Sequence, residues 1–247
     1  MVKFWDSINK VISDADIILE VLDAKLINET RNSEIEDKVK RAGKPLIYVI
    51  NKADAVQRSQ IIKNKQNLHP SIFVSAKEKR GINELRTLIM SKSGSKKEVK
   101  VGVLGYPNTG KSSLINALGG GGKARTSSQS GFTKGHQDIR LSQRLKVIDT
   151  PGVIPYKEND SVKHALTSTV DYAHIKDPDM AVFELMRRFP GKIEEYYDVY
   201  ISDDLEETLE EIAIVKNKLR SGGNPDFDAV SRMILKDWQA GKIKIKN

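Results

Sequence analysis

The stretch Gly105–Ser112 constrains the fold of this 247-residue chain more than any other feature. It reads Gly-Tyr-Pro-Asn-Thr-Gly-Lys-Ser and matches the pattern G-x-x-x-x-G-K-S, which holds phosphates when it joins a strand to a helix. An apolar strand is predicted before it, at Val99–Leu104, and a helix is predicted after it, reaching Leu118. The alternative, an ordinary glycine-containing loop, does not need these flanking elements. The pattern therefore predicts a phosphate-binding loop inside an α/β fold.

Each position of this loop has an expected task. Backbone N–H groups and the helix N-terminus would surround the phosphates. The lysine would reach the β- and γ-phosphates, and the serine hydroxyl would ligate Mg²⁺. The predicted phosphate-binding residues are Asn108, Thr109, Gly110, Lys111, Ser112 and Ser113.

Apolar runs alternate with amphipathic stretches through the first part of the chain. The predicted strands cover residues 17–22, 46–50, 72–74, 99–104 and 145–148, and the predicted helices cover 32–42, 57–67, 81–90 and 110–118. Such alternation is typical of a mostly parallel sheet that binds ligands at the carboxyl ends of its strands. Residues 91–98, rich in serine and lysine, are predicted to form a flexible basic connector.

Two further motifs follow predicted strands. Asp149-Thr-Pro-Gly152 comes directly after an apolar strand, so Asp149 is predicted to hold Mg²⁺ through water and the Gly152 amide to contact the γ-phosphate. Asn51-Lys-Ala-Asp54 ends the strand at 46–50, and the Asp54 carboxylate can accept two hydrogen bonds from guanine. Adenine would leave that carboxylate without its partners, which favours guanine by several kcal/mol.

A short third motif supports the guanine assignment. Ser75-Ala-Lys77 ends the next predicted strand, where the Ala76 amide can donate to the guanine carbonyl. The predicted guanine-binding residues are Asn51, Lys52, Asp54, Ser75, Ala76 and Lys77.

Together these motifs resemble those of the P-loop GTPases, but in an unusual order. Asn51-Lys-Ala-Asp54 and Ser75-Ala-Lys77 precede the phosphate loop, and Asp149-Thr-Pro-Gly152 follows it. That order resembles the circularly permuted ribosome-assembly GTPases of the YlqF/YawG type. Asp23-Ala-Lys25 and Phe132-Thr-Lys-Gly135 add to the resemblance, which extends over nearly the whole chain. It implies a circularly permuted Ras-like G domain with a three-layer, mostly parallel sheet.

The resemblance also implies a set of residues for catalysis. Lys111, Thr133 and Gly152 are the expected catalytic residues, with Ser112, Thr133 and Asp149 holding Mg²⁺. Asn108 resembles the asparagine that helps to hold K⁺ in potassium-stimulated relatives. Val153 stands where Ras-type enzymes carry a water-orienting glutamine, so slow intrinsic turnover is expected. His136 is the nearest candidate for a replacement, although a solvent-exposed loop histidine is the favoured explanation.

The last part of the chain has a helical pattern. A helix is predicted over Asp203–Arg220, with Asp203 and Glu206 as its capping pair, and a second apolar stripe runs from Phe227 to Trp238. We therefore expect a GTPase domain at 1–156 and a small all-helical domain at 157–247. Because the switch after Gly152 leads into the helical domain, the γ-phosphate is expected to reposition that domain.

Composition limits the function classes. The chain has no cysteine and no apolar run long enough to span a membrane, so we expect a cytoplasmic protein without disulfides, thiolate metal sites or membrane contacts. We also expect a monomer. The formal net charge of +8 is concentrated in residues 77–146, which hold 15 basic and 4 acidic residues. Such concentration favours an anionic partner.

The leading hypothesis is a GTPase that binds GTP and GDP and contacts rRNA or a pre-50S ribosomal particle. The predicted RNA-binding face surrounds the phosphate loop and switch and includes Lys123, Arg125, Lys134, Arg140 and Arg144, with Lys242, Lys244 and Lys246 as a further contact. The alternative is a nucleotide-gated protein that recruits a protein partner through its C-terminal helices with little hydrolysis. An NTP-dependent kinase is disfavoured because it would not need Asn51-Lys-Ala-Asp54.

Overall fold

The computed structural model describes residues 2–57, 68–120, 137–150 and 160–245. The chain divides into two compact units, Met1–Glu158 and Asn159–Asn247. Within the described ranges, no helix has the length and apolar character needed to cross a bilayer.

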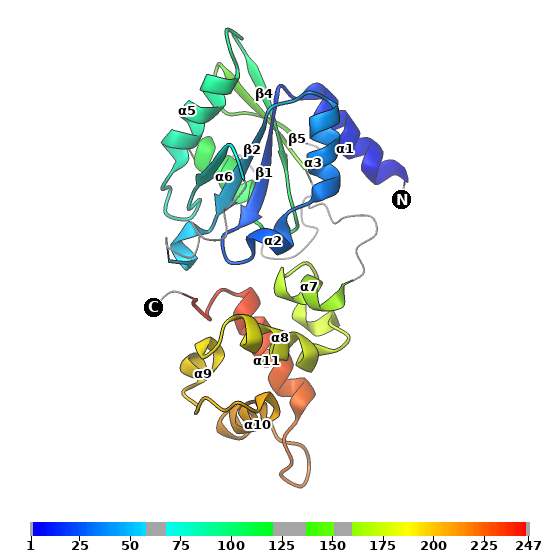
Figure 1. Cartoon of the computed structure of the whole chain (residues 1–247), viewed down its shortest axis with the longest axis vertical. Coiled ribbons are helices and arrows are strands. Elements are labelled where there is room, and N and C mark those ends of the chain that lie inside the picture. Colours follow the sequence, from blue (N-terminus) through cyan, green and yellow to red (C-terminus); the bar gives the residue numbers. More distant parts are fainter. Residues whose placement is uncertain (1, 58–67, 121–136, 151–159, 246–247) are drawn as a thin grey trace. The chain divides into compact units, whose positions relative to one another are not determined.

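The first unit is built on a six-stranded sheet with the order β3-β2-β1-β4-β6-β5 (Figure 1). Its strands are β1 (Ile17–Asp23), β2 (Leu46–Asn51), β3 (Ser71–Phe73), β4 (Val99–Leu104), β5 (Gln137–Arg140) and β6 (Leu145–Asp149). All neighbours are parallel except β5, which runs antiparallel to β6. Counted from β4 as the first strand, the order becomes 2-3-1-4-5-6, so the permutation moves the chain ends and leaves the sheet continuous.

Helices cover both faces of this sheet. They are α1 (Val2–Asp14), α2 (Ile27–Thr30), α3 (Ser33–Arg41), the 3₁₀ turn η1 (Ala53–Ala55), α5 (Ile82–Lys92) and α6 (Lys111–Leu118). Odd-numbered β1 residues such as Leu19 pack in one core with Leu85 of α5 and Leu114 of α6. Ile18 points to the opposite face and packs with Val11 of α1. This three-layer α/β architecture confirms the predicted fold class.

The central strands are mostly apolar because both of their faces are covered. All seven residues of β1 are buried, including Glu20 and Asp23. A parallel sheet covered by helices on both sides favours such continuous apolar runs. The pairings Asp23 with Asn51 and Val103 with Asp149 bring the motif-bearing strand ends to one edge, called here the carboxyl edge.

Two segments of the first unit differ from the sequence-based expectations. Residues 91–98 do not behave as a free connector: Ser93 is buried and donates to the Met90 carbonyl at 2.7 Å, and Lys96 forms an ion pair with Asp16. The helix α1 was not predicted from the sequence, and it lies before the first predicted strand at residues 17–22. The helix predicted at 57–67 lies largely outside the described residues.

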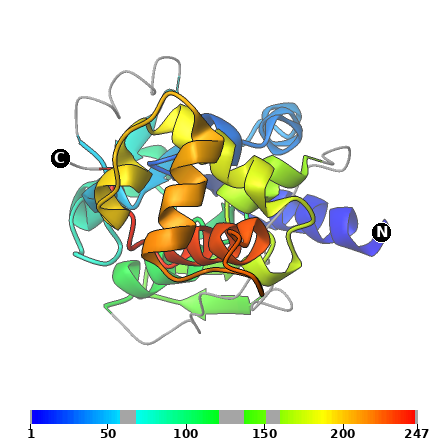
Figure 2. The same ribbon diagram turned by 90° about the horizontal axis from the view of Figure 1, so that it is seen from below.

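The second unit consists of α-helices and a 3₁₀ turn in its described part (Figure 2). Its elements are α7 (Ser161–Leu166), η2 (Tyr172–His174), α8 (Pro178–Arg188), α9 (Lys192–Tyr197), α10 (Leu205–Val215) and α11 (Phe227–Gln239). Trp238 is buried in its core, donates from Nε1 to the Leu166 carbonyl at 2.9 Å, and lies 5.2 Å from the Phe189 ring.

The predicted ends of α10 were wrong. Asp204, not Asp203, caps the helix, because its carboxylate accepts from the Glu206 and Glu207 amides. The helix stops at Val215 and does not continue to Arg220, since Asn217 adopts a left-handed conformation at φ 50°. A left-handed residue satisfies the last carbonyls of a helix and ends it. Phe227, the first residue of the second predicted apolar stripe, is 39% exposed and therefore is not part of the buried core.

Candidate functional site

The phosphate loop follows β4 at the carboxyl edge and contacts its neighbours closely. Gly105 has φ +143°, and a Cβ there would lie 2.5 Å from the Val21 carbonyl oxygen. Gly110 has φ +93°, and a Cβ there would lie 2.3 Å from Asn51 Nδ2. Both glycines are therefore required by space as well as by backbone conformation. They bring the loop against β1 and against the first guanine motif.

Lys111 lies across the loop at the start of α6. Its Nζ donates to the carbonyls of Gly105 at 3.1 Å and Tyr106 at 2.7 Å. Burial lowers the pKa of Lys111 to about 8, while the nearby Asp149 carboxylate acts in the opposite direction. A polyanion bound at this loop would favour the charged ammonium.

Ser112 and Asp149 come together from different elements. Ser112 Oγ donates to Asp149 Oδ2 at 3.2 Å, and Asp149 Oδ1 is buried with no hydrogen-bond partner among the described residues. Burial raises the pKa of Asp149, opposed by Lys111 and by the Ser112 hydrogen bond. A hydroxyl oxygen beside a carboxylate with an unused buried oxygen is a donor set that suits Mg²⁺. These residues therefore fit the predicted metal.

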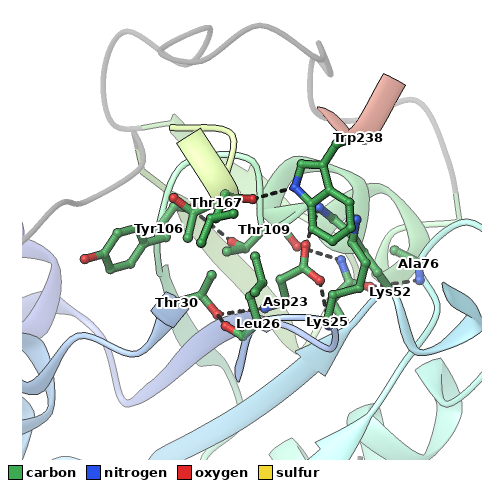
Figure 3. Close-up of polar contacts among 12 residues, drawn as sticks. Asp23, Lys25, Leu26, Thr30, Lys52, Ala76, Tyr106, Thr109, Thr167 and Trp238 are labelled. Atoms are coloured by element: carbon green, nitrogen blue, oxygen red, sulfur yellow. Dashed lines mark hydrogen bonds and ion pairs between the residues drawn. The ribbon is translucent and has the colours of Figure 1, made fainter. Parts of the chain in front are cut away.

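Asn51 connects the phosphate loop to the loop after β3. Its Nδ2 donates to the Thr109 carbonyl at 2.9 Å, and its Oδ1 accepts from the Ala76 amide at 3.1 Å (Figure 3). The side chain is only 2% exposed, so neither bond competes strongly with water. A guanine carbonyl would share or replace the Ala76 amide bond that Asn51 accepts here. One buried side chain thus holds two ligand-binding loops in register.

Lys52 is held by a residue that sequence reasoning did not assign to the site. Lys52 Nζ donates to Asp23 Oδ2 at 2.7 Å, and the Lys25 amide donates to Asp23 Oδ1 at 2.9 Å (Figure 3). Burial would raise the pKa of Asp23, but the ammonium groups of Lys52 and Lys25 hold it below its ordinary value. The sequence did contain a signal for this role, because Asp23 is an acidic residue directly at the end of an apolar strand.

The same acidic residue is also anchored through its backbone. The Asp23 amide donates to Thr30 Oγ1 at 3.0 Å, and Thr30 Oγ1 in turn donates to the Leu26 carbonyl at 2.7 Å (Figure 3). Thr30 is buried, so this turn is fixed from inside. Asp23 therefore positions Lys52 from a rigid base.

The remaining guanine-motif residues occupy the same edge. Asp54 is half-buried in the turn η1, which is anchored by the Ala53 amide donating to the Val74 carbonyl at 3.1 Å. Ser75 is buried and its Oγ accepts from the Glu78 amide at 3.1 Å. Lys77 is exposed. The structure therefore brings both guanine motifs beside the phosphate loop.

Two phosphate-loop residues complete the described part of the site. Asn108 adopts a left-handed conformation at φ 58°, and Ser113 is exposed in the first turn of α6. Several predicted residues lie outside the described ranges, namely Thr133, His136, Gly152, Val153, Lys123, Arg125, Lys134 and Lys246.

Two of the basic residues predicted to lie around the phosphate loop and switch, Arg140 and Arg144, lie elsewhere, so their predicted location was wrong. Arg140 ends β5 and Arg144 directly precedes β6, at the edge of the sheet opposite the phosphate loop. The Arg144 carbonyl accepts from Val99, the first residue of β4, at 2.8 Å. A strand as long as β4 separates the two edges by about 17 Å. The sequence pattern could not show that β5 and β6 meet in a turn at the far edge. In the second unit, Lys242 forms an ion pair with Asp237.

Replacing Asn51 with alanine is expected to lower the free energy of unfolding by about 2–4 kcal/mol, because it leaves the Thr109 carbonyl and the Ala76 amide buried without partners. Urea unfolding measures this loss, and GTP affinity should fall with it. Asn83→Ala is the control, since Asn83 is exposed on α5. Equal effects of the two substitutions would contradict the bridging role of Asn51.

Comparisons with known proteins find similarity to GTP-binding proteins. Residues 100–218 match the family model described as 50S ribosome-binding GTPase. An uncharacterized GTP-binding protein of Methanocaldococcus jannaschii is 40% identical over 243 residues, covering 96% of this chain and 65% of that protein. Nucleolar GTP-binding protein 2 of Saccharomyces cerevisiae is 34% identical over 254 residues, and the match covers 98% of this chain and 52% of that protein. The chain thus spans about half to two thirds of the length of these relatives.

Solved structures show the same fold. The GDP-bound YlqF of T. maritima superposes with a TM-score of 0.67 at 23% identity, covering 96% of this chain and 95% of that one. Its GNP-bound form gives the same TM-score at 22% identity, covering 98% of this chain and 96% of that one. With the permuted motif order, the continuous sheet and the joined guanine and phosphate loops, these matches show that the homologues of this chain are GTP-binding proteins and that its fold is the circularly permuted fold of YlqF.

Proposed function

We propose that this protein binds GTP and hydrolyses it to GDP and phosphate, as a switch in the assembly of the large ribosomal subunit. The observation that carries the proposal is the Asn51 bridge, because it joins the phosphate loop to the Ala76 loop. A guanine nucleotide spans these two loops. The similarity to a nucleolar GTP-binding protein and to the family model described as 50S ribosome-binding GTPase supports the ribosomal part.

The residues of the chain have separate tasks in this reaction. The Lys111 ammonium, now bonded to the loop carbonyls, would turn to the β- and γ-phosphates and balance charge that develops between them. Asp54 would read the guanine N–H groups, and the backbone amides of residues 108–113 would hold the phosphates. Ser112 and Asp149 would hold Mg²⁺, which supplies electrostatic stabilisation of the phosphate oxygens when bound. Thr133 and Gly152 remain the proposed switch contacts.

The experiment that tests the proposal is a hydrolysis assay with purified large-subunit precursor particles. We expect slow release of phosphate from GTP by the protein alone and a clear acceleration by the particle. Lys111→Ala should abolish both, whereas Lys79→Ala, an exposed neighbour of the guanine loop, should retain both. GTP binding without any hydrolysis, with or without particles, would refute the enzymatic part.

The metal prediction follows from the Ser112–Asp149 pair. Asp149→Asn is expected to reduce the dependence of GTP affinity on Mg²⁺, and its affinity with EDTA should equal that of the wild type. Loss of the charged ligand should weaken Mg²⁺-dependent binding by about tenfold or more, equivalent to at least one charge-assisted contact. Titration of a fluorescent GTP analogue with and without Mg²⁺ measures this. An unchanged Mg²⁺ effect in Asp149→Asn would contradict the assignment.

Potassium dependence is a further expectation from Asn108. GTP hydrolysis should be faster in KCl than in NaCl at equal ionic strength, and Asn108→Ala should remove the difference. Phosphate release measured in the two salts decides the point. Equal rates for the wild-type protein in both salts would contradict K⁺ binding.

A second candidate function is favoured by exposed apolar side chains on the second unit. Tyr200 is 80% exposed, Ile201 59%, Ile214 58% and Val215 52%. Such side chains suit a protein partner, so a nucleotide-gated recruitment protein with little hydrolysis is the alternative. Ile201→Ser with Ile214→Ser should abolish particle binding if recruitment through this unit dominates, and should leave it unchanged if rRNA contacts of the first unit dominate.

A further inference from the structure

Seven basic side chains gather at the edge of the sheet opposite the phosphate loop, called here the basic edge. They come from the end of α5, the turn that follows it, the start of β4 and the β5–β6 hairpin (Figure 1). The members are Lys92, Lys96, Lys97, Lys100, Arg140, Arg144 and Lys146. Arg144 Nη2 donates to the Lys96 carbonyl at 3.2 Å, which joins the turn to the hairpin.

Three of these cations form a row across adjacent strands. Lys100 of β4 is paired with Lys146 of β6, and Lys146 is paired with Arg140 of β5. Directly opposed residues of neighbouring strands point to the same face, and the strand spacing places the row within about 10 Å. Like charges in such positions destabilise a sheet by up to about 1 kcal/mol per pair. The row is therefore an arrangement that folding alone does not favour.

The acidic residues at this edge do not neutralise it. Glu98 accepts from Lys146 at 2.8 Å and lies 3.7 Å from Arg140, while Asp16 pairs with Lys96. The Lys146 hydrogen bond, with Arg140 and Lys100 nearby, holds the pKa of Glu98 below its ordinary value, as expected in a positive potential. Together with the exposed Asp14, three carboxylates face seven cations.

A hollow lies beside the hairpin on the face of the sheet that α5 and α6 cover, whereas the Lys100–Lys146–Arg140 row lies on the other face. It has a volume of ≈ 650 Å³, and its lining includes Arg86 and Met90 of α5, Leu118 and Gly120 at the end of α6, and Arg144. Arg86 is fixed there by hydrogen bonds from its guanidinium to the Leu118 carbonyl at 2.6 Å and to Asn83 Oδ1 at 2.9 Å. A concave surface with fixed cations suits an extended polyanion better than a single small ion.

We infer that the basic edge binds the phosphate backbone of rRNA, on the side of the G domain opposite the nucleotide. The inference rests on the proposed role in ribosome assembly and names the surface that makes the contact. RNA fits because its charges repeat at short intervals, as the Lys100–Lys146–Arg140 row does, and because the described edge carries serine and glutamine but no aromatic side chain for base stacking. The contact would fix orientation on the particle rather than read sequence.

The test compares two variants with equal loss of charge in the same unit. Lys100→Gln with Arg144→Gln removes one lysine and one arginine from the basic edge, and Lys79→Gln with Arg80→Gln removes the same pair from the carboxyl edge. All four side chains are exposed. Binding to a fluorescently labelled large-subunit rRNA transcript is measured by anisotropy between about 50 and 200 mM KCl.

The basic-edge variant should bind the transcript about tenfold or more weakly, and its slope of log affinity against log salt should fall by about 2. The carboxyl-edge variant should stay close to the wild type. Relief of the Lys100–Lys146 repulsion should offset the loss of the exposed Arg144–Lys96 hydrogen bond, so the basic-edge variant should unfold at about the same urea concentration as the wild type. Both variants should bind a fluorescent GTP analogue normally.

Three outcomes would overturn the inference. Equal weakening in both variants would assign RNA binding to net charge. Unchanged RNA binding by the basic-edge variant would show that the basic edge does not bind RNA. An acidic protein would then be the remaining ligand for the basic edge, and the proposed GTPase function would be unaffected. A wild-type protein that fails to bind the transcript would refute the rRNA partner itself.

Discussion

Replacing Asp54 with asparagine is expected to lower the affinity for GTP about 100- to 1000-fold and to raise the affinity for xanthosine triphosphate. The carboxylate is placed to accept from two guanine N–H groups, and each charge-assisted hydrogen bond contributes about 1.5–3 kcal/mol. An asparagine side chain offers one acceptor and one donor. Xanthine carries a carbonyl where guanine carries its amino group, so it matches the asparagine.

Competition for a fluorescent guanine nucleotide by unlabelled GTP, XTP and ATP measures this exchange of specificity. Glu78→Gln is the matched control, because Glu78 is an exposed acid in the neighbouring loop and should leave all three affinities unchanged. ATP should bind neither protein well. Wild-type GTP affinity in Asp54→Asn would show that this loop does not read the base.

The second large effect concerns Glu20, a carboxyl group inside the sheet. Glu20 has no exposed surface; its Oε1 accepts from the Asn32 amide at 2.8 Å, and its Oε2 has no hydrogen-bond partner in the part of the chain that the structure describes. Burial raises the pKa of Glu20 to about 8, with a further contribution from Glu36 and opposition from Arg31. The side chain is therefore protonated in the folded protein at neutral pH.

This shift makes the folded state less stable as the pH rises. Below the unfolded-state pKa of about 4.5 both states carry the proton, so Glu20 contributes no difference. Between about 4.5 and 8 only the folded state keeps it, and the free energy of unfolding falls by about 1.4 kcal/mol per pH unit, or about 5 kcal/mol in all. Above the folded-state pKa the difference remains constant.

Glu20→Gln should remove this penalty, because the amide is neutral at every pH and keeps the acceptor for Asn32. We expect the variant to exceed the wild type in free energy of unfolding by about 4 kcal/mol at pH 8 and to match it near pH 4.5. Urea unfolding across this pH range measures the difference. Glu84→Gln on the exposed face of α5 is the control. A difference between Glu20→Gln and wild type that does not grow with pH would contradict a buried protonated carboxyl.

The motif loops could be predicted from the sequence because their chemistry is local. A phosphate loop needs its glycines, lysine and serine within eight positions, and the strand and helix beside it follow from apolar patterns. The order of the motifs was enough to predict the permutation. Asn51 could be assigned to the site, but its bonds to Thr109 and Ala76 could not, since they join segments 58 and 25 residues apart.

Other errors have specific physical causes. Asp203 and Asp204 are equally good capping residues by type, and only the backbone conformation decides that Asp204 accepts the first amides of α10. The serine- and lysine-rich segment 91–98 has the composition of a linker, yet a buried Ser93 and the Lys96–Asp16 pair hold it. Composition does not include such long-range contacts.

The sequence by itself determined the α/β class, the permuted order of the nucleotide motifs and the size of the basic excess, because each depends on neighbours along the chain. Only the tertiary structure decided that Asp23 holds Lys52, that Glu20 lies buried, and that Arg140 and Arg144 join Lys100 at the edge away from the nucleotide. Those relations depend on strand pairing between distant segments. Hydrophobic burial on both faces of the sheet fixes that pairing, and the pairing decides which charged side chains become neighbours.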